Sequence, residues 1–298
     1  MKLAIVTATT DLDRSRECRL SWTHQGAPSI TTFVVVNGWT AGRARGWRHS
    51  AVSPARWTYW AEEILGTVPA FAIGVQKALE EGAEIIACFH DDLLIEQQGW
   101  DLVVQAVFTQ PTIGLVGFGG ATGLGHPEIY QLPYDPMQLA RYDFRSNMRD
   151  AEAHGLRETQ AIRVACLDGF SQIGRAEYWR GQPLAEHDWA VKGLDGLTEN
   201  LFTAMQTLGV VHHLYDGMLG CYAKRLGWEV WMLPIACHHF GGQTAVGDAR
   251  YHAWANVEAQ KRDRLEGITE EGIGDQVFWQ QAHAIGYDHF RDVLPIRV

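Results

Sequence analysis

Short apolar runs alternate with longer amphipathic segments along most of the chain. The runs are typical of strands buried on both faces of a sheet, and they cover residues 2–8, 30–36, 85–90, 113–118, 161–167 and 228–234. Between them, apolar side chains recur at helical spacing over residues 69–81, 98–108, 197–208 and 218–226. Strands and helices in alternation indicate crossover connections. We therefore predict an α/β fold with a mostly parallel central sheet flanked by helices.

Segments without such periodicity are interpreted as connections. We expect a polar loop at residues 9–19 and a loop rich in arginine and tryptophan at residues 39–60. We expect a long connection with a short helix at residues 126–160. The C-terminal part predicts two helices, near residues 251–265 and 274–285. We therefore expect one large domain and a C-terminal helical extension, covering residues 1–245 and 246–298.

Composition narrows the class of protein. The 298 residues are enough to bury a sizeable core, and a hydrophobic content of 46% with 20% charged residues is ordinary for a soluble globular protein. No apolar run approaches the roughly eighteen residues of a membrane span, and the N-terminus lacks a signal-peptide pattern. Five scattered cysteines without a C-x-x-C pair argue against a disulfide framework or a zinc site, and fit a cytoplasmic location. The net charge of −10 disfavours a general nucleic-acid binder.

Two adjacent carboxylates, Asp91 and Asp92, follow the apolar run 85–90 directly. In open α/β sheets, ligands bind outside the carboxyl ends of the strands, so this is where a site is expected. Hard divalent cations take oxygen ligands, and Mg²⁺ is commonly held by one or two carboxylates together with substrate phosphates. The alternative is that the pair caps the next helix or faces solvent.

Further candidate residues lie in the second half of the chain. Asp168 follows one predicted strand, and His238 and His239 follow another. Asp216 lies at the mouth of a predicted helix, where the helix dipole favours an ionised carboxylate. Simple helix capping is the alternative for Asp216.

Two loops are candidate walls of such a site. The glycine-rich segment 117–125 suggests close approach of the backbone to a ligand, but it lacks the Lys-Ser/Thr of a P-loop. In the loop 39–60, Arg43, Arg45 and Arg48 stand between tryptophans. Arginine and aromatic side chains together grip phosphate and stack on sugars or bases. The alternative is a surface loop whose tryptophans fold back onto the core.

Over roughly residues 1–245, the order of elements resembles the inverting family-2-type glycosyltransferases with the Rossmann-like GT-A fold. Phe89-His90-Asp91-Asp92 is similar to the Asp-x-Asp region of that family. Tyr215-Asp216, before a helix that ends in Arg225-Leu226-Gly227, is similar to its paired-acid block. His239-Phe240-Gly241-Gly242 is similar to its histidine turn.

The chain departs from the family pattern at four positions. Phe89 and Tyr215 stand where acids are usual. The acid that usually ends the second strand is replaced around Asn37, and an asparagine in the helix before the Asp-x-Asp strand is replaced by Ala72.

The resemblance implies an enzyme, a glycosyltransferase of the hexosyltransferase type, that moves a sugar from a nucleoside-diphosphate sugar to an acceptor hydroxyl with inversion. It implies Mn²⁺ or Mg²⁺ as cofactor, held by Asp92 and His239, with His238 as the spare ligand. It also implies Asp216 as the general base, with Asp168 as the rival carboxylate.

The same resemblance implies where the donor binds. Residues 1–125 would form the nucleotide-sugar-binding half and residues 126–245 the acceptor and catalytic half. The base of the donor, with UDP the first choice of nucleotide, would lie against residues from the ends of the first two strands, with a carboxylate toward the ribose. These residues are Thr7, Ala8, Thr9 and Asn37, with Asp91 as the carboxylate.

Two other classes of function stay open. One is a non-catalytic GT-A-like protein that binds a nucleotide sugar and has lost its metal with the missing acids. The other is a metal-dependent hydrolase built on Asp91, Asp92 and His239. For a transferase, the expected acceptors are a glycan, a lipid-linked sugar or, less favoured by the acidic charge, a modified nucleic-acid base.

Overall fold

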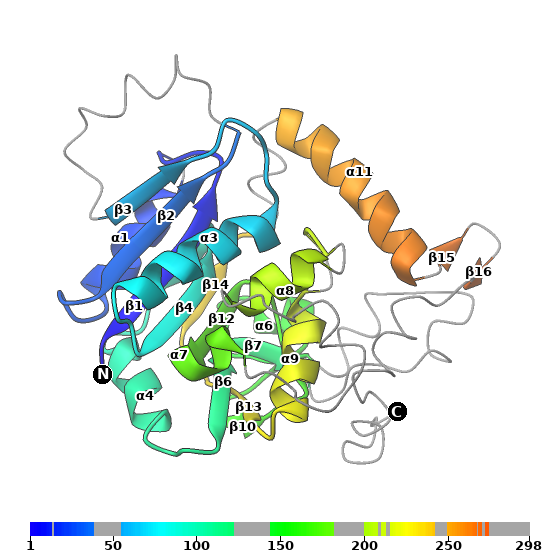
Figure 1. Ribbon diagram of the computed structural model, residues 1–298. Coiled ribbons are helices and arrows are strands. Elements are labelled where there is room, and N and C mark those ends of the chain that lie inside the picture. The colour runs from blue at the N-terminus through cyan, green and yellow to red at the C-terminus, as the bar shows by residue number, and fades with distance from the viewer. Residues whose placement is uncertain are drawn as a thin grey trace.

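The computed structural model describes residues 1–13, 15–38, 55–121, 144–181, 200–207, 210–212, 215–241, 249–266, 268–269 and 272–273. Within these ranges, the largest sheet has eight strands (Figure 1). Their order is β10 (Ile162–Arg163), β13 (Glu229–Met232), β6 (Ile113–Gly117), β12 (Ser171–Arg175), β4 (Ile85–His90), β1 (Leu3–Thr9), β2 (Thr31–Val36) and β3 (Ala55–Trp60).

The central sheet is mixed and mostly parallel. Strands β1, β2, β3 and β4 run parallel to their neighbours in this group, and β13 runs parallel to β6. Strand β12 lies antiparallel between β4 and β6, and β10 is antiparallel to β13. The α/β fold class with a mostly parallel central sheet flanked by helices, as predicted from the sequence, is confirmed.

Helices cover both faces of the sheet, because successive side chains of a strand point to opposite faces. On one face, Val6, Ile86 and Leu115 pack against α3 (Thr67–Glu80), α7 (Ala176–Arg180), α8 (Leu201–Thr207) and α9 (Tyr215–Arg225). On the other face, Ile5 and Ala87 pack against α1 (Arg16–His24) and α4 (Trp100–Val107). Figure 1 shows α3, α8 and α9 together on one side of the strands.

Three smaller sheets accompany the central sheet among the described residues. One consists of β11 (Cys166–Leu167), β7 (Gly119–Ala121), β8 (Phe144–Ser146) and β9 (Leu156–Arg157), beside the short helix α6 (Ala151–His154). Another pairs β5 (Leu93–Ile95) with β14 (Cys237–His239), and a third pairs β15 (Ile268–Thr269) with β16 (Gly272–Ile273). The indole of Trp22 on α1 donates to the Leu93 carbonyl at 2.7 Å, which fixes β5 against the main body.

Several sequence predictions need correction. Helix α1 lies partly in the segment predicted as a loop, because its buried face is made by only a few side chains and includes the polar Arg19. Strand β3 lies in the second predicted loop, because an edge strand is half exposed and lacks a continuous apolar run. The strand predicted over residues 161–167 is two short strands, because the chain leaves β10 of the central sheet and enters β11 of the small one.

The C-terminal part contains α11 (Ala249–Glu266), which confirms the first of the two helices predicted there. The second, at residues 274–285, lies outside the described residues. The division into a domain at residues 1–245 and an extension stays a prediction. In the part of the chain that the structure describes, no helix is both long and apolar enough to cross a membrane.

Candidate functional site

The candidate site lies where β4 ends. His90 is the last residue of that strand, and Asp91 and Asp92 form the turn into β5. Strand β14 pairs with β5 so that His239 lies opposite Leu93, and the Phe240 amide donates to the Asp92 carbonyl at 3.2 Å. The pairing therefore joins two segments that are far apart in the sequence, and places the His239 imidazole beside the Asp92 carboxylate.

His90, Asp92 and His239 form a group that could hold a metal ion. One ligand atom from each residue lies within 4.8 Å of the others. His239 Nε2 is 3.1 Å from Asp92 Oδ1. Burial lowers the pKa of His239, but the hydrogen bond and the charge of Asp92 outweigh it and raise the pKa above its ordinary value. An imidazole nitrogen and a carboxylate oxygen that converge in this way can also serve as ligands of one cation.

The orientation of His90 is fixed by a tyrosine. The Tyr215 hydroxyl donates its single proton to the Gly169 carbonyl at 3.0 Å, because a carbonyl can only accept. His90 Nε2 lies 2.9 Å from the same hydroxyl and must therefore be the donor, which leaves the lone pair on Nδ1. Burial and the neighbouring His239 lower the pKa of His90 to about 4. Both effects keep the imidazole neutral, the form that binds metals.

Gly169 is needed at this contact. A Cβ at this position would overlap the Tyr215 hydroxyl. Glycine therefore lets the β11–β12 turn approach α9 closely enough for the Tyr215 hydrogen bond.

Asp216 and Asp168 form a second group beside the first. Asp216 lies in the first turn of α9, and its Oδ1 accepts the Gly217 amide at 2.9 Å. Asp168 follows β11, and its Oδ1 accepts the Phe170 amide at 3.1 Å. Burial and the charge of Asp168 raise the pKa of Asp216 from 3.8 to about 6, although backbone amides oppose this. Burial therefore outweighs the backbone amides at the start of α9 in setting the pKa of Asp216, although a pKa of about 6 still leaves the carboxyl mostly ionised at neutral pH.

Asp168 connects the two groups. Its negative charge favours the protonated forms of the Asp216 carboxyl and of the His90 and His239 imidazoles. Tyr215, which binds His90, is the residue next to Asp216 in the chain. The three candidate ligands and the two carboxylates therefore lie in one region of the structure, and His90 is the one among them that the sequence analysis did not select.

His238 faces away from the candidate ligands. Adjacent residues of a strand point to opposite faces, so only one of the two histidines on β14 can face Asp92. His238 Nδ1 lies 3.7 Å from Asp150 Oδ1, and its ring packs edge-on against Phe240. The structure thus places His239 in the group, with its ring stacked on Phe170, and places His238 outside it.

The residues expected to bind a nucleotide lie at the ends of β1 and β2. Thr7 and Ala8 pair with Phe89 and His90 of β4, but Thr7 is fully buried. The Thr9 hydroxyl interacts with the backbone of the following loop, at Asp11. The side-chain oxygen of Asn37 accepts a hydrogen bond from the Leu65 backbone amide at 3.2 Å. The backbone amide of Asn37 donates to the Thr9 carbonyl at 2.8 Å. Asn37 therefore ties both strands to the segment that leads into α3.

Asp91 has neighbours that the sequence did not indicate. The negative charge of Asp91 favours the protonated forms of Arg19 on α1 and of Tyr251 on α11. The Arg19 side chain is buried and donates to the Leu12 carbonyl at 2.8 Å. Arg19 was missed because it lies in a segment predicted as a loop, and Tyr251 because nothing in a helical period shows what the helix packs against. The segments that contain Arg43, Arg45, Arg48 and residues 122–125 lie outside the described residues.

The fold and this site define the class of the molecule: an α/β protein with a candidate metal centre and a carboxylate pair at the carboxyl edge of its sheet. No family model matches the chain. No curated protein matches it either.

Among solved structures, the chain is similar to a mannosyltransferase, PcManGT from Pyrobaculum calidifontis, in complex with GDP-Man and Mn²⁺. The identity is 18% with a TM-score of 0.46, over 99% of this chain and 72% of that one. S. aureus TarS in complex with UDP is similar at 11% identity and a TM-score of 0.39, over 78% of this chain and 58% of that one. A mannose-1-phosphate geranyltransferase from Thermus thermophilus is similar at 16% identity and a TM-score of 0.39, over 80% of this chain and 75% of that one.

Removing the Tyr215 hydroxyl tests how His90 is oriented. In Tyr215→Phe the ring stays in place, but His90 Nε2 loses its partner and the imidazole is no longer held in one tautomer. Loss of such an orienting contact typically lowers metal affinity about 10- to 100-fold. We expect this loss in a Mn²⁺ titration followed by isothermal calorimetry, with an unchanged far-UV circular dichroism spectrum. Unchanged metal affinity would show that His90 is not a ligand.

Proposed function

We propose that the chain is a metal-dependent glycosyltransferase that moves a sugar from a nucleoside-diphosphate sugar to an acceptor hydroxyl, with inversion. One observation supports this proposal above others: the group of His90, Asp92 and His239 lies beside the carboxylate of Asp216, with Asp168 acting on both. A cation next to a diphosphate and a base next to an acceptor are the two requirements of this displacement.

The three candidate metal ligands fit a divalent cation, and they fit Mn²⁺ better than Mg²⁺. Two imidazoles and one carboxylate are unlike the all-oxygen shell that Mg²⁺ prefers. Three protein ligands also leave coordination positions for substrate oxygens. When bound, the cation would neutralise charge on the departing diphosphate.

The remaining chemistry is assigned to side chains of this protein. Asp216 accepts the proton of the acceptor hydroxyl, and its pKa of about 6 keeps it mostly ionised at neutral pH. Burial and, after it, the charge of Asp168 keep the pKa of Asp216 above the ordinary value, which makes Asp216 a stronger base than a solvated carboxylate. Tyr215 and Gly169 hold His90 in position.

The donor is proposed to lie along the ends of β1 and β2. Its base would contact the region of Thr7, Ala8, Thr9 and Asn37, and Asp91 would face the ribose. Thr7, Thr9 and Asn37 are buried and Ala8 is half-buried, so Ala8 offers the accessible surface of this set for the contact. A UDP-sugar is the first candidate, with residues 1–125 as the donor half and residues 126–245 as the acceptor half.

A thermal-shift screen of nucleotide sugars tests the proposal. We expect a UDP- or GDP-sugar to raise the melting temperature only when Mn²⁺ is present, since a ligand bound by the native state stabilises it. Product analysis with candidate acceptors then follows for the donor that binds. Stabilisation by no nucleotide sugar, with or without metal, would rule out this function.

A metal-dependent hydrolase is the second candidate, because the same three ligands and a nearby carboxylate could activate water. The two functions differ in their products. A hydrolase releases free sugar or phosphate at its full rate without an acceptor, whereas a transferase needs the acceptor hydroxyl for its full rate.

A further inference from the structure

A cavity of about 400 Å³ lies along α3, and none of its lining residues belongs to the candidate metal centre. Strand β3, at the edge of the described sheet, forms one wall, and α8 contributes to the other. We call this cavity, between β3, α3 and α8, the α3 groove. Nothing in the proposed reaction accounts for it.

One wall of the α3 groove is aromatic. Trp57 and Tyr59 are two positions apart on β3, so they lie on the same face of the strand. Their rings stack, with centroids 6.0 Å apart and planes at 28°. Trp57 packs beside Phe33, its neighbour on β2, with ring centroids 6.3 Å apart, while Tyr59 is 41% exposed. The result is a flat aromatic surface held on a rigid strand and open toward the groove.

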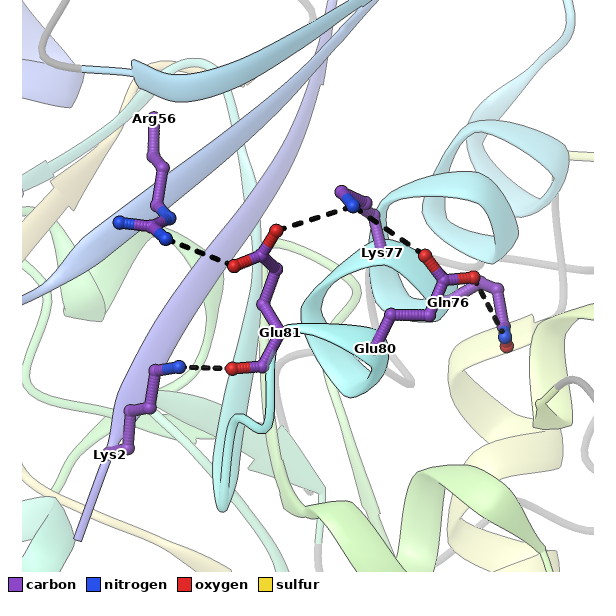
Figure 2. Close-up of polar contacts among 6 residues, drawn as sticks. All are labelled: Lys2, Arg56, Gln76, Lys77, Glu80 and Glu81. Atoms are coloured by element: carbon purple, nitrogen blue, oxygen red, sulfur yellow. Dashed lines mark hydrogen bonds and ion pairs between the residues drawn. The ribbon is translucent and has the colours of Figure 1, made fainter.

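The facing wall is polar, and one of its hydrogen-bond acceptors has no partner among the described residues. Gln76 Nε2 donates to Glu80 Oε1 at 3.3 Å, which fixes the orientation of the amide because a carboxylate cannot donate (Figure 2). Gln76 Oε1 is buried and has no partner among the described residues. Thr203 and Gln206 of α8 add further donors and acceptors to the lining. A buried acceptor without a donor leaves a place for a hydroxyl group of a ligand.

Among the described residues, the charges around the α3 groove cancel. Lys77 lies 3.6 Å from a Glu80 oxygen and 3.3 Å from a Glu81 oxygen, and Arg56 lies 3.1 Å from the other oxygen of Glu81. Figure 2 shows these four side chains as one connected network. Both cations are therefore paired, and the chain as a whole carries a net charge of −10. Such a surface disfavours a polyanion, while its amides disfavour a purely apolar ligand.

We propose that the α3 groove binds a neutral oligosaccharide. Sugar rings present apolar C–H faces that stack on aromatic side chains, and hydroxyl groups that bond to amides and carboxylates. Ligand sites generally combine an aromatic surface with a few placed polar groups, as Trp57, Tyr59 and Gln76 do here. Among these features, the unpartnered Gln76 oxygen opposite a stacked aromatic pair is the most specific.

The α3 groove also leads to the candidate site. Leu65, at one end, donates its amide to the Asn37 side chain, and Pro69 follows the first residues of α3. Glu80 lines the other end, eleven residues along the helix, a span of roughly 16 Å at 1.5 Å per residue. This length suits several sugar rings in a row. That the bound chain is the acceptor rests on the proposed function, whereas binding itself does not.

Binding is tested on the full chain with a panel of neutral hexasaccharides built from glucose, mannose, galactose or N-acetylglucosamine. We expect at least one to bind in isothermal titration calorimetry at up to millimolar concentration. The Kd should rise about tenfold in Tyr59→Ala and in Gln76→Ala, the size expected for loss of one aromatic or hydrogen-bonding contact. Tyr59→Phe should keep the affinity, because it retains the ring. Leu102→Ala, a change of an exposed side chain on α4, is the matched control and should bind like wild type.

Three results would overturn the proposal: no hexasaccharide binds, binding is unchanged in both Tyr59→Ala and Gln76→Ala, or only a sulfated or phosphorylated polymer binds the α3 groove. The outcome is separable from that of the proposed function. If the protein binds a hexasaccharide through Tyr59 but binds no nucleotide sugar, the oligosaccharide site is supported and the transferase function is contradicted. A transferase whose acceptor KM is the same in Tyr59→Ala and in wild type shows that the groove does not hold the acceptor.

Discussion

Asp216→Asn is expected to lower kcat by about 10²- to 10⁴-fold while leaving donor affinity nearly unchanged. The reason is that the amide cannot accept the proton of the acceptor hydroxyl, whereas its oxygen can still accept the Gly217 amide. Steady-state rates and a donor titration measure the two effects separately. Asp13→Asn, an exposed aspartate, is the matched control.

The pH dependence of the wild-type rate tests independently whether Asp216 is the general base. Burial and the charge of Asp168 raise the pKa of Asp216 to about 6, so the rate should fall tenfold per pH unit below that value. In Asp168→Asn the repulsion is removed, and the midpoint should move to lower pH. If Asp168→Asn abolishes transfer and Asp216→Asn does not, the roles of the two carboxylates are exchanged.

Asp216→Asn should also stabilise the fold. Because the pKa of Asp216 rises from 3.8 to about 6 on folding, the native state binds this proton more tightly than the unfolded chain. The resulting stability is fully present below pH 3.8 and is lost as the pH rises through about 6. Above that pH the variant lacks the buried charge, and its free energy of unfolding should be higher by on the order of 1–3 kcal/mol. A gain at pH 7.5 that disappears at low pH would identify the cause.

Asp92→Asn and His239→Ala should each abolish metal-dependent donor binding and lower metal-dependent turnover by at least about 100-fold. Each change removes one of three candidate ligands, and loss of even an orienting contact outside the ligand shell commonly lowers metal affinity about 10- to 100-fold. Mn²⁺ titration with and without the donor nucleotide measures the effect.

His238→Ala is the matched control for this experiment. It removes an imidazole from the neighbouring position of the same strand, but one that faces Asp150. It should leave the response to Mn²⁺ unchanged. The assignment of ligands is wrong if His238→Ala removes the metal response and His239→Ala does not.

The positions of the carboxylates could be predicted from the sequence, because they depend on local features. Asp92 follows a six-residue apolar strand, and Asp216 opens a helix, so both lie at the carboxyl edge of the sheet in the structure. The mostly parallel sheet also followed from the alternation of strands and helices. The antiparallel strand β12 was missed, because its sequence, Ser-Gln-Ile-Gly-Arg, has almost no apolar periodicity and is specified by its two neighbours.

The choice between neighbouring side chains could not be predicted. Which of His238 and His239 faces Asp92 depends on the register of β14 against β5, and a shift by one residue would exchange them. His90 was interpreted as the end of a strand, and its orientation within the candidate metal group is fixed by Tyr215, 125 positions away in the sequence. Arg19 reaches Asp91 only after α1 packs on the sheet. Each of these contacts is long-range, and no local pattern encodes it.

Helix α11 makes the segment after residue 245 more than an appendage. Arg250 donates to the Gly38 carbonyl at 2.9 Å, the Trp254 ring lies against Gly66, and Tyr251 lies near Asp91 and Thr67. A chain shortened at that boundary would expose the side of His212 that packs against Tyr251 and Trp254, and would hydrate the Asp91 carboxylate. The first turns of α11 thus lie against the strand ends, and the C-terminal segment helps to shield from water a candidate site built almost entirely by residues that precede it.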